Sequence, residues 1–163
     1  MNRRLAGLAA FMRELGLDLS DFDQRLLTQK AVYLFQVLGV DLGYRYNWYL
    51  KGPYSPSLTQ DAYAVEEDGI EKYETVRFKP EASSAVATVS TLLEALPEGL
   101  DQTRWAELLA SMHFLKHLYS QKLSNQKIFA KLSEEKGFSK EQNEAAWEAL
   151  DQVNLIEQKK IDL

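Results

Sequence analysis

The sequence predicts an α+β protein that is mostly helical and carries a small antiparallel sheet in its N-terminal half. Three observations lead to this prediction. Apolar residues recur at intervals of three and four through most of the 163 residues, which is typical of helices with one buried face. Aromatic residues alternate with other residues only in the stretch 43–58, as in a half-buried strand. Residues that start and end helices then divide the chain into separate elements.

Several helices are expected in the N-terminal half. The first residues are basic and then apolar, as in a signal peptide, but Arg13 and Glu14 interrupt the apolar run, so an amphipathic helix is expected there instead. The next helix covers 22–38, and its wide apolar surface indicates a central position. Another covers 81–96 and ends before Pro97, because proline cannot continue a helix.

The residues from Tyr44 to Lys51 are expected to form a strand with one buried face. Side chains two apart in a strand share a face. The face expected to be buried holds Tyr44, Tyr46, Trp48 and Leu50, and the outward face holds Arg45, Asn47, Tyr49 and Lys51. A second strand is expected at 73–79, ended by Pro80, and would pair antiparallel with the first.

A tight turn and a helix are expected directly after the first strand. Gly52 and Pro53 should stop that strand, because proline has no amide hydrogen to donate to a ladder. Ser55 suits the capping position of a helix and Pro56 suits its first turn. A helix is therefore predicted at 56–68.

The chain is expected to divide into two helical subdomains, residues 1–97 and 98–163, or to pack them together as one domain. Three C-terminal helices followed by a short strand at Leu155 and Ile156 resemble the order of a winged-helix unit. The last helix, 140–152, would be the recognition helix of such a unit. Its net charge is −3, so DNA phosphates would repel it.

Composition and motifs exclude several classes of function. The formal net charge is −5 without a basic cluster, so no nucleic-acid partner is expected. No apolar run approaches the roughly 18 residues of a membrane span, and no membrane partner is expected. The absence of cysteine excludes disulfides and thiolate metal sites, and fits a reducing cytoplasm.

His113 and His117 lie four residues apart on one predicted helix, where both are expected to be partly exposed rather than metal ligands. No catalytic residue and no cofactor is expected, so the protein is predicted not to be an enzyme.

Three segments of the chain resemble a known arrangement. They are a helix with Gln29, Lys30 and Tyr33, an aromatic strand at 43–49, and the sequence GPYSPSL at 52–58. The pattern resembles the uncharacterised YwgA-type proteins of bacteria and archaea, which share GPYS. It is also similar to the Panacea antitoxin domain, which occurs in toxin–antitoxin pairs, in prophages and in a proteolytic adaptor. The resemblance implies a mainly helical protein that acts by protein–protein contact.

The expected function is therefore a cytoplasmic protein–protein interaction module, antitoxin-like or adaptor-like, in a phage-related or defence-related system. The alternative is a winged-helix-like transcription regulator. The aromatic segment either fills a core or forms a surface that grips a partner, and both roles can coexist if alternate side chains point outward. The residues expected to contact a protein partner are Arg45, Tyr49, Lys51 and Tyr54. The residues expected to have motif or structural roles are Gln29, Lys30, Tyr33, Trp48, Gly52, Pro53 and Ser55.

Overall fold

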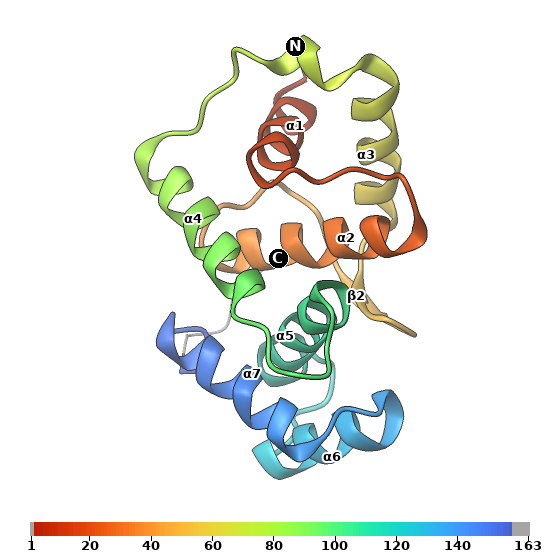
Figure 1. The fold of residues 1–163 in the computed structure, drawn as a ribbon, viewed down its shortest axis with the longest axis vertical. Helices are drawn as coiled ribbons and strands as arrows, with labels where there is room; N and C mark the ends of the chain where they lie inside the picture. The colour runs from red at the N-terminus through yellow and green to blue at the C-terminus, as the bar shows by residue number, and fades with distance from the viewer. Residues whose placement is uncertain (1, 158–163) are drawn as a thin grey trace.

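Seven α-helices, a short 3-10 helix and one β-hairpin make up the fold of residues 2–157, the part of the chain that the computed structural model describes (Figure 1). In chain order the elements are α1 (Arg3–Leu15), α2 (Phe22–Val37), β1 (Asn47–Tyr49), β2 (Gly52–Tyr54), α3 (Pro56–Asp68), η1 (Ile70–Tyr73), α4 (Pro80–Glu94), α5 (Gln102–His117), α6 (Asn125–Lys136) and α7 (Lys140–Gln152). The predicted fold class, mostly helical with a small antiparallel sheet, is confirmed.

Helix α2 lies at the centre of the fold, as its wide apolar surface predicts. In Figure 1 it runs across the middle of the molecule, with α1 and α3 on one side and α5, α6 and α7 on the other. Every residue of α2 from Leu27 to Val37 is buried, and so is every residue of α5 from Trp105 to Leu115. These two helices pack against each other. Polar side chains on either helix must therefore find partners inside the protein.

Local capping explains where several helices begin. The side chain of Ser55 caps α3, so the helix predicted at 56–68 is confirmed. A capping box between Ser139 and Gln142 starts α7. Helix α4 begins at Pro80 and not after it. Proline occupies the first turn of that helix, where its missing amide hydrogen costs nothing.

The sheet is a hairpin of adjacent segments, so the predicted pairing with residues 73–79 is wrong. Strands β1 and β2 pair antiparallel, with Trp48 opposite Pro53 and Tyr49 opposite Gly52. The Gly52–Pro53 pair therefore belongs to the sheet and does not end it. Gly52 has φ = 91°, which lets the chain reverse direction directly before β2. Proline is tolerated in β2 because this strand has only one partner.

Residues 73–79 form no strand because other groups bind their backbone. The chain leaves η1 at Tyr73 and then forms a loop up to α4. The two terminal guanidinium nitrogens of Arg13 donate to the carbonyl oxygens of Tyr73 and Val76, at 2.7 and 2.6 Å. A charged donor thus satisfies carbonyl groups that a partner strand would otherwise bind.

The C-terminal helices α5, α6 and α7 occur in the predicted order and form the lower part of Figure 1. Leu155 and Ile156 are buried but form no strand, so that prediction is wrong. The amide of Leu155 donates to the carbonyl oxygen of Leu150 at 2.9 Å, which closes the end of α7 instead. One hydrophobic core includes residues from both halves of the chain. Across the predicted boundary, Trp105 Nε1 donates to the carbonyl oxygen of Leu92 at 2.7 Å.

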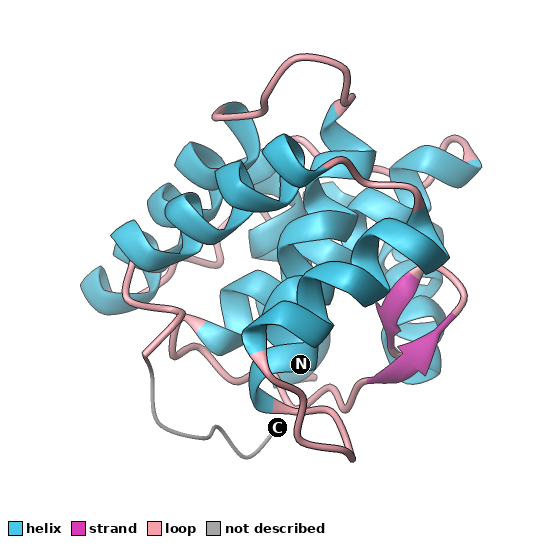
Figure 2. Cartoon of the chain, turned by 90° about the horizontal axis from the view of Figure 1, so that it is seen from below, coloured by secondary structure: helices cyan, strands magenta, loops and turns pink. Residues whose placement is uncertain are grey.

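The amphipathic helix predicted at the N-terminus is α1, whose residues Leu8, Phe11 and Met12 are buried in the core. Seen from below, the hairpin lies at one edge of the helical body (Figure 2). Within residues 2–157, none of the helices combines the length and the apolar character that crossing a membrane requires.

Candidate interaction site

Two glutamine side chains of α2 bind the backbone on both sides of the hairpin. Gln36 Nε2 donates to the carbonyl oxygen of Tyr44 at 3.0 Å, and Gln36 Oε1 accepts from the amides of Leu42 and Tyr44 at 3.1 and 3.0 Å. Gln29 lies seven residues earlier on the same face of the helix. Its Nε2 donates to the carbonyl oxygen of Ser55 and its Oε1 accepts from the Ser55 amide, both at 2.9 Å. The side-chain amides of Gln29 and Gln36 thus bind backbone groups that a neighbouring strand would bind in a larger sheet.

The buried position of both glutamines explains their chemistry. Gln29 is 3% exposed and Gln36 is 2% exposed. A primary amide both donates and accepts, so each side chain pairs with a peptide group as another peptide would. The structure places Gln29 in the scaffold and not on a surface. Sequence reasoning missed Gln36, although an amide seven residues after Gln29 within an apolar stripe is a signal that could have found it.

Lys30 is fully buried and binds the hairpin from α2. Its Nζ donates to the carbonyl oxygen of Pro53 at 2.6 Å. Burial lowers the pKa of Lys30 to about 7, and the negative charge of Glu107 opposes this effect. Lysine is almost never fully buried unless it is paired. The hydrogen bond from this amine therefore connects β2 to α2.

A second lysine binds the hairpin from α6. Lys136 Nζ donates to the carbonyl oxygen of Leu50 at 2.6 Å and lies 3.1 Å from Glu107 Oε2. The buried Glu107 also accepts from Arg104 Nη1 at 3.0 Å. Burial lowers the pKa of Lys136, whereas the charge of Glu107 and its hydrogen bond act to raise it. The ammonium group of Lys136 also lies 5.0 Å from the centre of the Trp48 ring. Side chains from both halves of the chain thus hold the hairpin.

Gly52 is required where the hairpin approaches α5. A Cβ atom at this position would overlap Ser111 Oγ and lie 3.8 Å from Cγ of Glu107. Its positive φ would also strain any residue with a side chain. The hydroxyl of Ser111 is buried and, within the described residues, has no hydrogen-bond partner. The backbone of β2 therefore lies directly on the helix.

Aromatic contacts secure β1. Tyr44 and Tyr46 are buried, as the predicted alternation requires. Trp48, on the same face, is half-buried, and its ring stacks on Phe114 with the ring centres 5.8 Å apart. It also meets the ring of Tyr119 edge-on at 6.0 Å. Tyr44, Tyr46 and Trp48 all point toward the core, so the predicted register is correct from residue 44 to residue 48.

His113 is more buried than the sequence predicts, whereas His117 is partly exposed as expected. His113 is fully buried, and its Nδ1 lies 2.7 Å from the hydroxyl of Tyr33. His117 is half-buried, and its Nε2 lies 2.9 Å from the carbonyl oxygen of Leu155. Burial lowers the pKa of His117, against the effect of that backbone contact. The expectation that His113 is partly exposed is wrong because α5 packs against α2 and also against α7.

The tip of the hairpin is the exposed part of this segment. Tyr49 is 44% exposed and Leu50 is 88% exposed. Leu50 was expected on the buried face, which is wrong because it lies in the turn between β1 and β2. Lys51 is exposed beside it. The half-buried Tyr54 meets the ring of Tyr49 edge-on at 5.4 Å. We refer to Tyr49, Leu50 and Lys51 as the hairpin tip.

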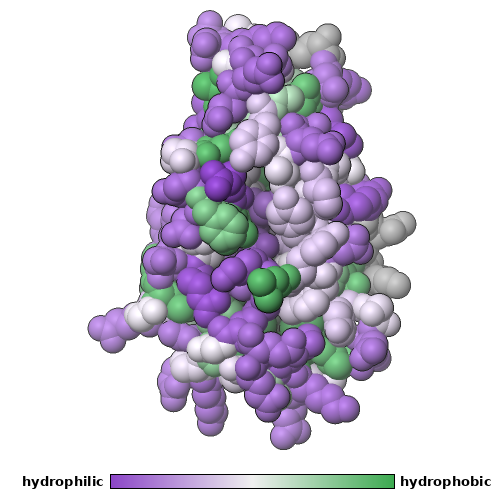
Figure 3. Space-filling model, turned by 90° about the vertical axis from the view of Figure 1, so that its right-hand side faces the viewer, coloured by the Kyte–Doolittle hydropathy of each residue, from purple (hydrophilic) through white to green (hydrophobic). Residues whose placement is uncertain are grey.

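The structure brings together three of the four residues expected to contact a partner. Tyr49, Lys51 and Tyr54 lie on the hairpin, whereas Arg45 lies before β1. Arg45 is exposed, and its guanidinium group is 3.7 Å from the carboxylate of Asp41. On the side of the molecule that carries the hairpin, the surface is mostly hydrophilic and its hydrophobic side chains are scattered (Figure 3). An exposed leucine is therefore a local feature of this face.

Among the described residues, no three His, Cys, Asp or Glu side chains are grouped in a way that could hold a metal ion. No protein-family model, no curated protein and no solved structure matches the chain.

Proposed function

We propose that this protein is a protein–protein interaction module that presents the hairpin tip to a partner. The observation that carries the proposal is the 88% exposure of Leu50 on a turn whose carbonyl oxygen is bound by Lys136. Among the large hydrophobic side chains of residues 2–157, Leu50 is the most exposed. A turn whose backbone is already held loses little further conformational freedom when its side chains enter a pocket of a partner. The hairpin therefore supports binding by a preorganised apolar contact.

The chemistry around Leu50 indicates what kind of partner would fit. Tyr49 supplies a rigid aromatic ring, a type of side chain that is enriched at interface hot spots. Lys51 adds an exposed positive charge beside it, whereas the charge of Arg45 lies before β1 and faces Asp41. A complementary surface would hold an apolar pocket for Leu50 with carboxylates at its rim.

The biological setting is also a proposal. The resemblance of the Gln29–Tyr33 helix, the aromatic strand and the GPYS turn to YwgA-type and Panacea proteins supports an antitoxin-like or adaptor-like role in a phage-related or defence-related system. The absence of cysteine supports a cytoplasmic location. We propose binding rather than catalysis, because the buried polar groups beneath the hairpin are engaged in holding its backbone.

A transcription regulator with a winged-helix arrangement is less well supported. The helix that would enter the DNA groove, α7, carries a net charge of −3. Affinity for duplex DNA depends on cations that approach phosphates. We therefore propose a protein, and not a nucleic acid, as the partner.

The experiment is an affinity capture from the native host with quantitative mass spectrometry, followed by titration of the captured partner with purified protein. Leu50→Ser and Tyr49→Ala should each weaken binding of that partner by about tenfold or more, as loss of a hot-spot side chain does. The matched control is Tyr63→Ala, because Tyr63 lies on α3 and is 45% exposed, close to the 44% of Tyr49.

Two results would contradict the proposal. In the first, both hairpin variants and the Tyr63 variant bind the partner as tightly as the wild type. In the second, Tyr63→Ala weakens binding as much as Tyr49→Ala does, so that the hairpin is not the contact. Circular dichroism melts of all three variants verify that each remains folded at the temperature of the binding assay.

A further inference from the structure

The amine of Lys30 is enclosed beneath the hairpin without a counter-charge of its own. It is fully buried, and its Nζ donates to the carbonyl oxygen of Pro53 in β2 at 2.6 Å. It forms no ion pair with any carboxylate of residues 2–157. A lysine in such a position is destabilised when it is charged, because burial without an ion pair disfavours the charged form. Proton uptake by this amine therefore weakens the contact between β2 and α2.

The charged groups around Lys30 do not supply the missing counter-charge. The carboxylate of Glu107 acts on it from α5, and the ammonium group of Lys136 opposes this effect from α6. Glu107 is already shared, because it accepts from Lys136 Nζ at 3.1 Å and from Arg104 Nη1 at 3.0 Å. Strands β1 and β2 carry no charged side chain, and Lys51 in the turn is a further cation that acts on Lys136. A proton on Lys30 thus adds positive charge to a cluster that already has more cations than carboxylates.

Ser111 marks the point where the hairpin closes over this cluster. Gly52 lies so close to Ser111 Oγ that a Cβ atom on the glycine would overlap the hydroxyl. Ser111 follows Glu107 by four residues and therefore lies on the same face of α5. Both side chains are buried. The hairpin in its observed position therefore covers the hydroxyl as well as the charged cluster.

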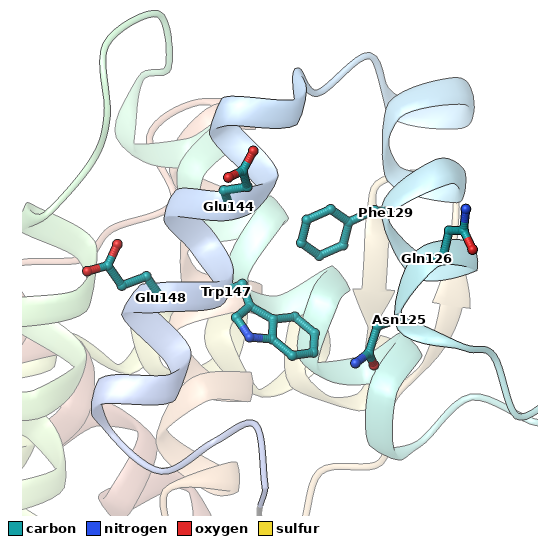
Figure 4. Close-up of a pocket in the computed structure, with 6 residues that line it drawn as sticks. All are labelled: Asn125, Gln126, Phe129, Glu144, Trp147 and Glu148. Carbon is teal, nitrogen blue, oxygen red and sulfur yellow. The ribbon is translucent and has the colours of Figure 1, made fainter.

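The hairpin is the part of this enclosure that is most easily displaced. Helix α6, which carries Lys136, is packed on α7: Figure 4 shows the rings of Phe129 and Trp147 in the space between these helices, and the ring centres are 5.8 Å apart. Asn143 Nδ2 of α7 also donates to the carbonyl oxygen of Phe129 at 3.3 Å. Each strand of the hairpin has only three residues, and an isolated hairpin is at most marginally stable in water. Lifting the hairpin is therefore the least costly way to hydrate Lys30.

We infer that proton uptake by Lys30 releases the hairpin from α2 and α5, so that the hairpin is held more firmly at pH 8 than at pH 6. The opening itself does not depend on the proposed function. Its consequence, which rests on the proposed function, is that the hairpin tip is preorganised for a partner at the higher pH and loosened at the lower one.

The direction of the effect follows from the protons that each state binds. Burial lowers the pKa of Lys30 to about 7 when the hairpin is closed, whereas the hydrated amine of an open hairpin has a pKa near 10.5. Between these two values the open state binds more protons, so the closed state gains stability as the pH rises. Tyr33 and Tyr46 stay neutral in this range, because burial raises the pKa of both.

The test measures how often the hairpin opens, and it needs no partner. The chain has no cysteine, so Ser111→Cys places a single thiol beneath Gly52, where a reagent such as dithionitrobenzoate reaches it only when the hairpin lifts. Dividing the reaction rate of a free thiol by the observed rate at the same pH gives the protection of this thiol and removes the titration of the thiol itself. The protection should rise about tenfold from pH 6 to pH 8, as the pKa values of about 7 and 10.5 require.

Lys30→Met in the same background assigns the effect to this amine. His113 and His117 also belong to the residue type that titrates near pH 6.5, so pH dependence alone is not sufficient. Without the amine, the protection should change by less than about twofold between pH 6 and pH 8. The same tenfold rise in Lys30→Met, or no rise with Lys30 present, would overturn the inference.

Ala106→Cys is the matched control, because Ala106 is fully buried on another face of α5 and its thiol reacts only when the whole protein unfolds. Equal protection of the two thiols at both pH values would overturn the inference, since global unfolding alone would then hydrate Lys30. If Lys30→Met does not fold, Glu107→Gln replaces it. Removal of the carboxylate that favours the charged amine should move the rise in protection to lower pH, and an unmoved rise would overturn the inference.

The two proposals fail in different ways. A captured partner that binds equally well at pH 6 and pH 8, alongside the expected change in thiol protection, would count against the hairpin tip as the contact and not against the opening of the hairpin.

Discussion

Lys30 gives the sharpest test of how the hairpin is held. The perturbation is Lys30→Met, which keeps an apolar stem of similar length and removes the amine that donates to Pro53. Burial places the pKa of Lys30 near 7 in the folded protein, against 10.5 in an unfolded chain. Between these two values the unfolded state binds more protons than the folded state. The free energy of unfolding contributed by Lys30 must therefore rise with pH across this window.

The magnitude follows from the two pKa values. At pH 7 the folded amine is half-protonated, whereas the unfolded amine is fully protonated; at pH 9 the folded amine is neutral and the unfolded amine remains mostly charged. Since one pKa unit corresponds to about 1.4 kcal/mol, the free energy of unfolding should rise by about 2 kcal/mol from pH 7 to pH 9 through this residue alone. Burial raises the pKa of Tyr33 and Tyr46, which reverses the trend at higher pH, so the comparison stops at pH 9.

The assay is urea unfolding of the wild type and of Lys30→Met at pH 7 and pH 9. The wild type should gain about 2 kcal/mol more than the variant over this interval. Lys127→Met is the matched control, because Lys127 is an exposed lysine of α6, and it should keep the wild-type dependence on pH. Identical pH dependence in the wild type and Lys30→Met would refute the reasoning. The amine would then be either solvated or fully charged in the folded state.

Three further outcomes are expected. Trp48→Ala should lower the free energy of unfolding by about 3 kcal/mol, because the Trp48 ring stacks on Phe114, whereas Tyr49→Ala should change it by less than about 1 kcal/mol. Thermal melts of the two variants measure this difference, and a larger loss in Tyr49→Ala than in Trp48→Ala would exclude the observed register. His113→Ala should lower the free energy of unfolding by about 2 kcal/mol or more, because it leaves a cavity and removes the buried partner of the Tyr33 hydroxyl. An unchanged midpoint of urea unfolding would contradict this. In a gel-shift titration at physiological salt, the protein should form no sub-micromolar complex with duplex DNA, and a sequence-specific complex would show that the acidic character of α7 does not prevent binding.

Three features of the fold follow from signals that lie within a few residues of one another. The start of α3 at Pro56 was predictable because Ser55 and Pro56 act within one turn of the helix. The central position of α2 was predictable because apolar residues of this helix cover a wide part of its own surface. The alternation from Tyr44 to Trp48 was predictable because side chains of extended backbone point to opposite sides.

The candidate site was only partly predictable. The tip residues Tyr49 and Lys51 are exposed as expected, but Leu50 was assigned to the wrong face because a turn ends the alternation after Tyr49. Lys136 and Glu107 were not singled out at all. They lie on α6 and α5, far along the chain from the hairpin, and no local pattern connects them with it.

The sequence by itself determined the helices, their caps and the inward face of the aromatic segment, because those depend on neighbours within a few residues. Only the tertiary structure decided which backbone groups meet side chains from distant parts of the chain. The loop at 73–79 depends on Arg13 of α1, and the burial of His113 depends on α5 being covered from two sides. The lowered pKa of Lys30 depends on the same enclosure. These features arise where segments distant along the chain exclude water together, and exclusion of water is not a property that any one segment carries.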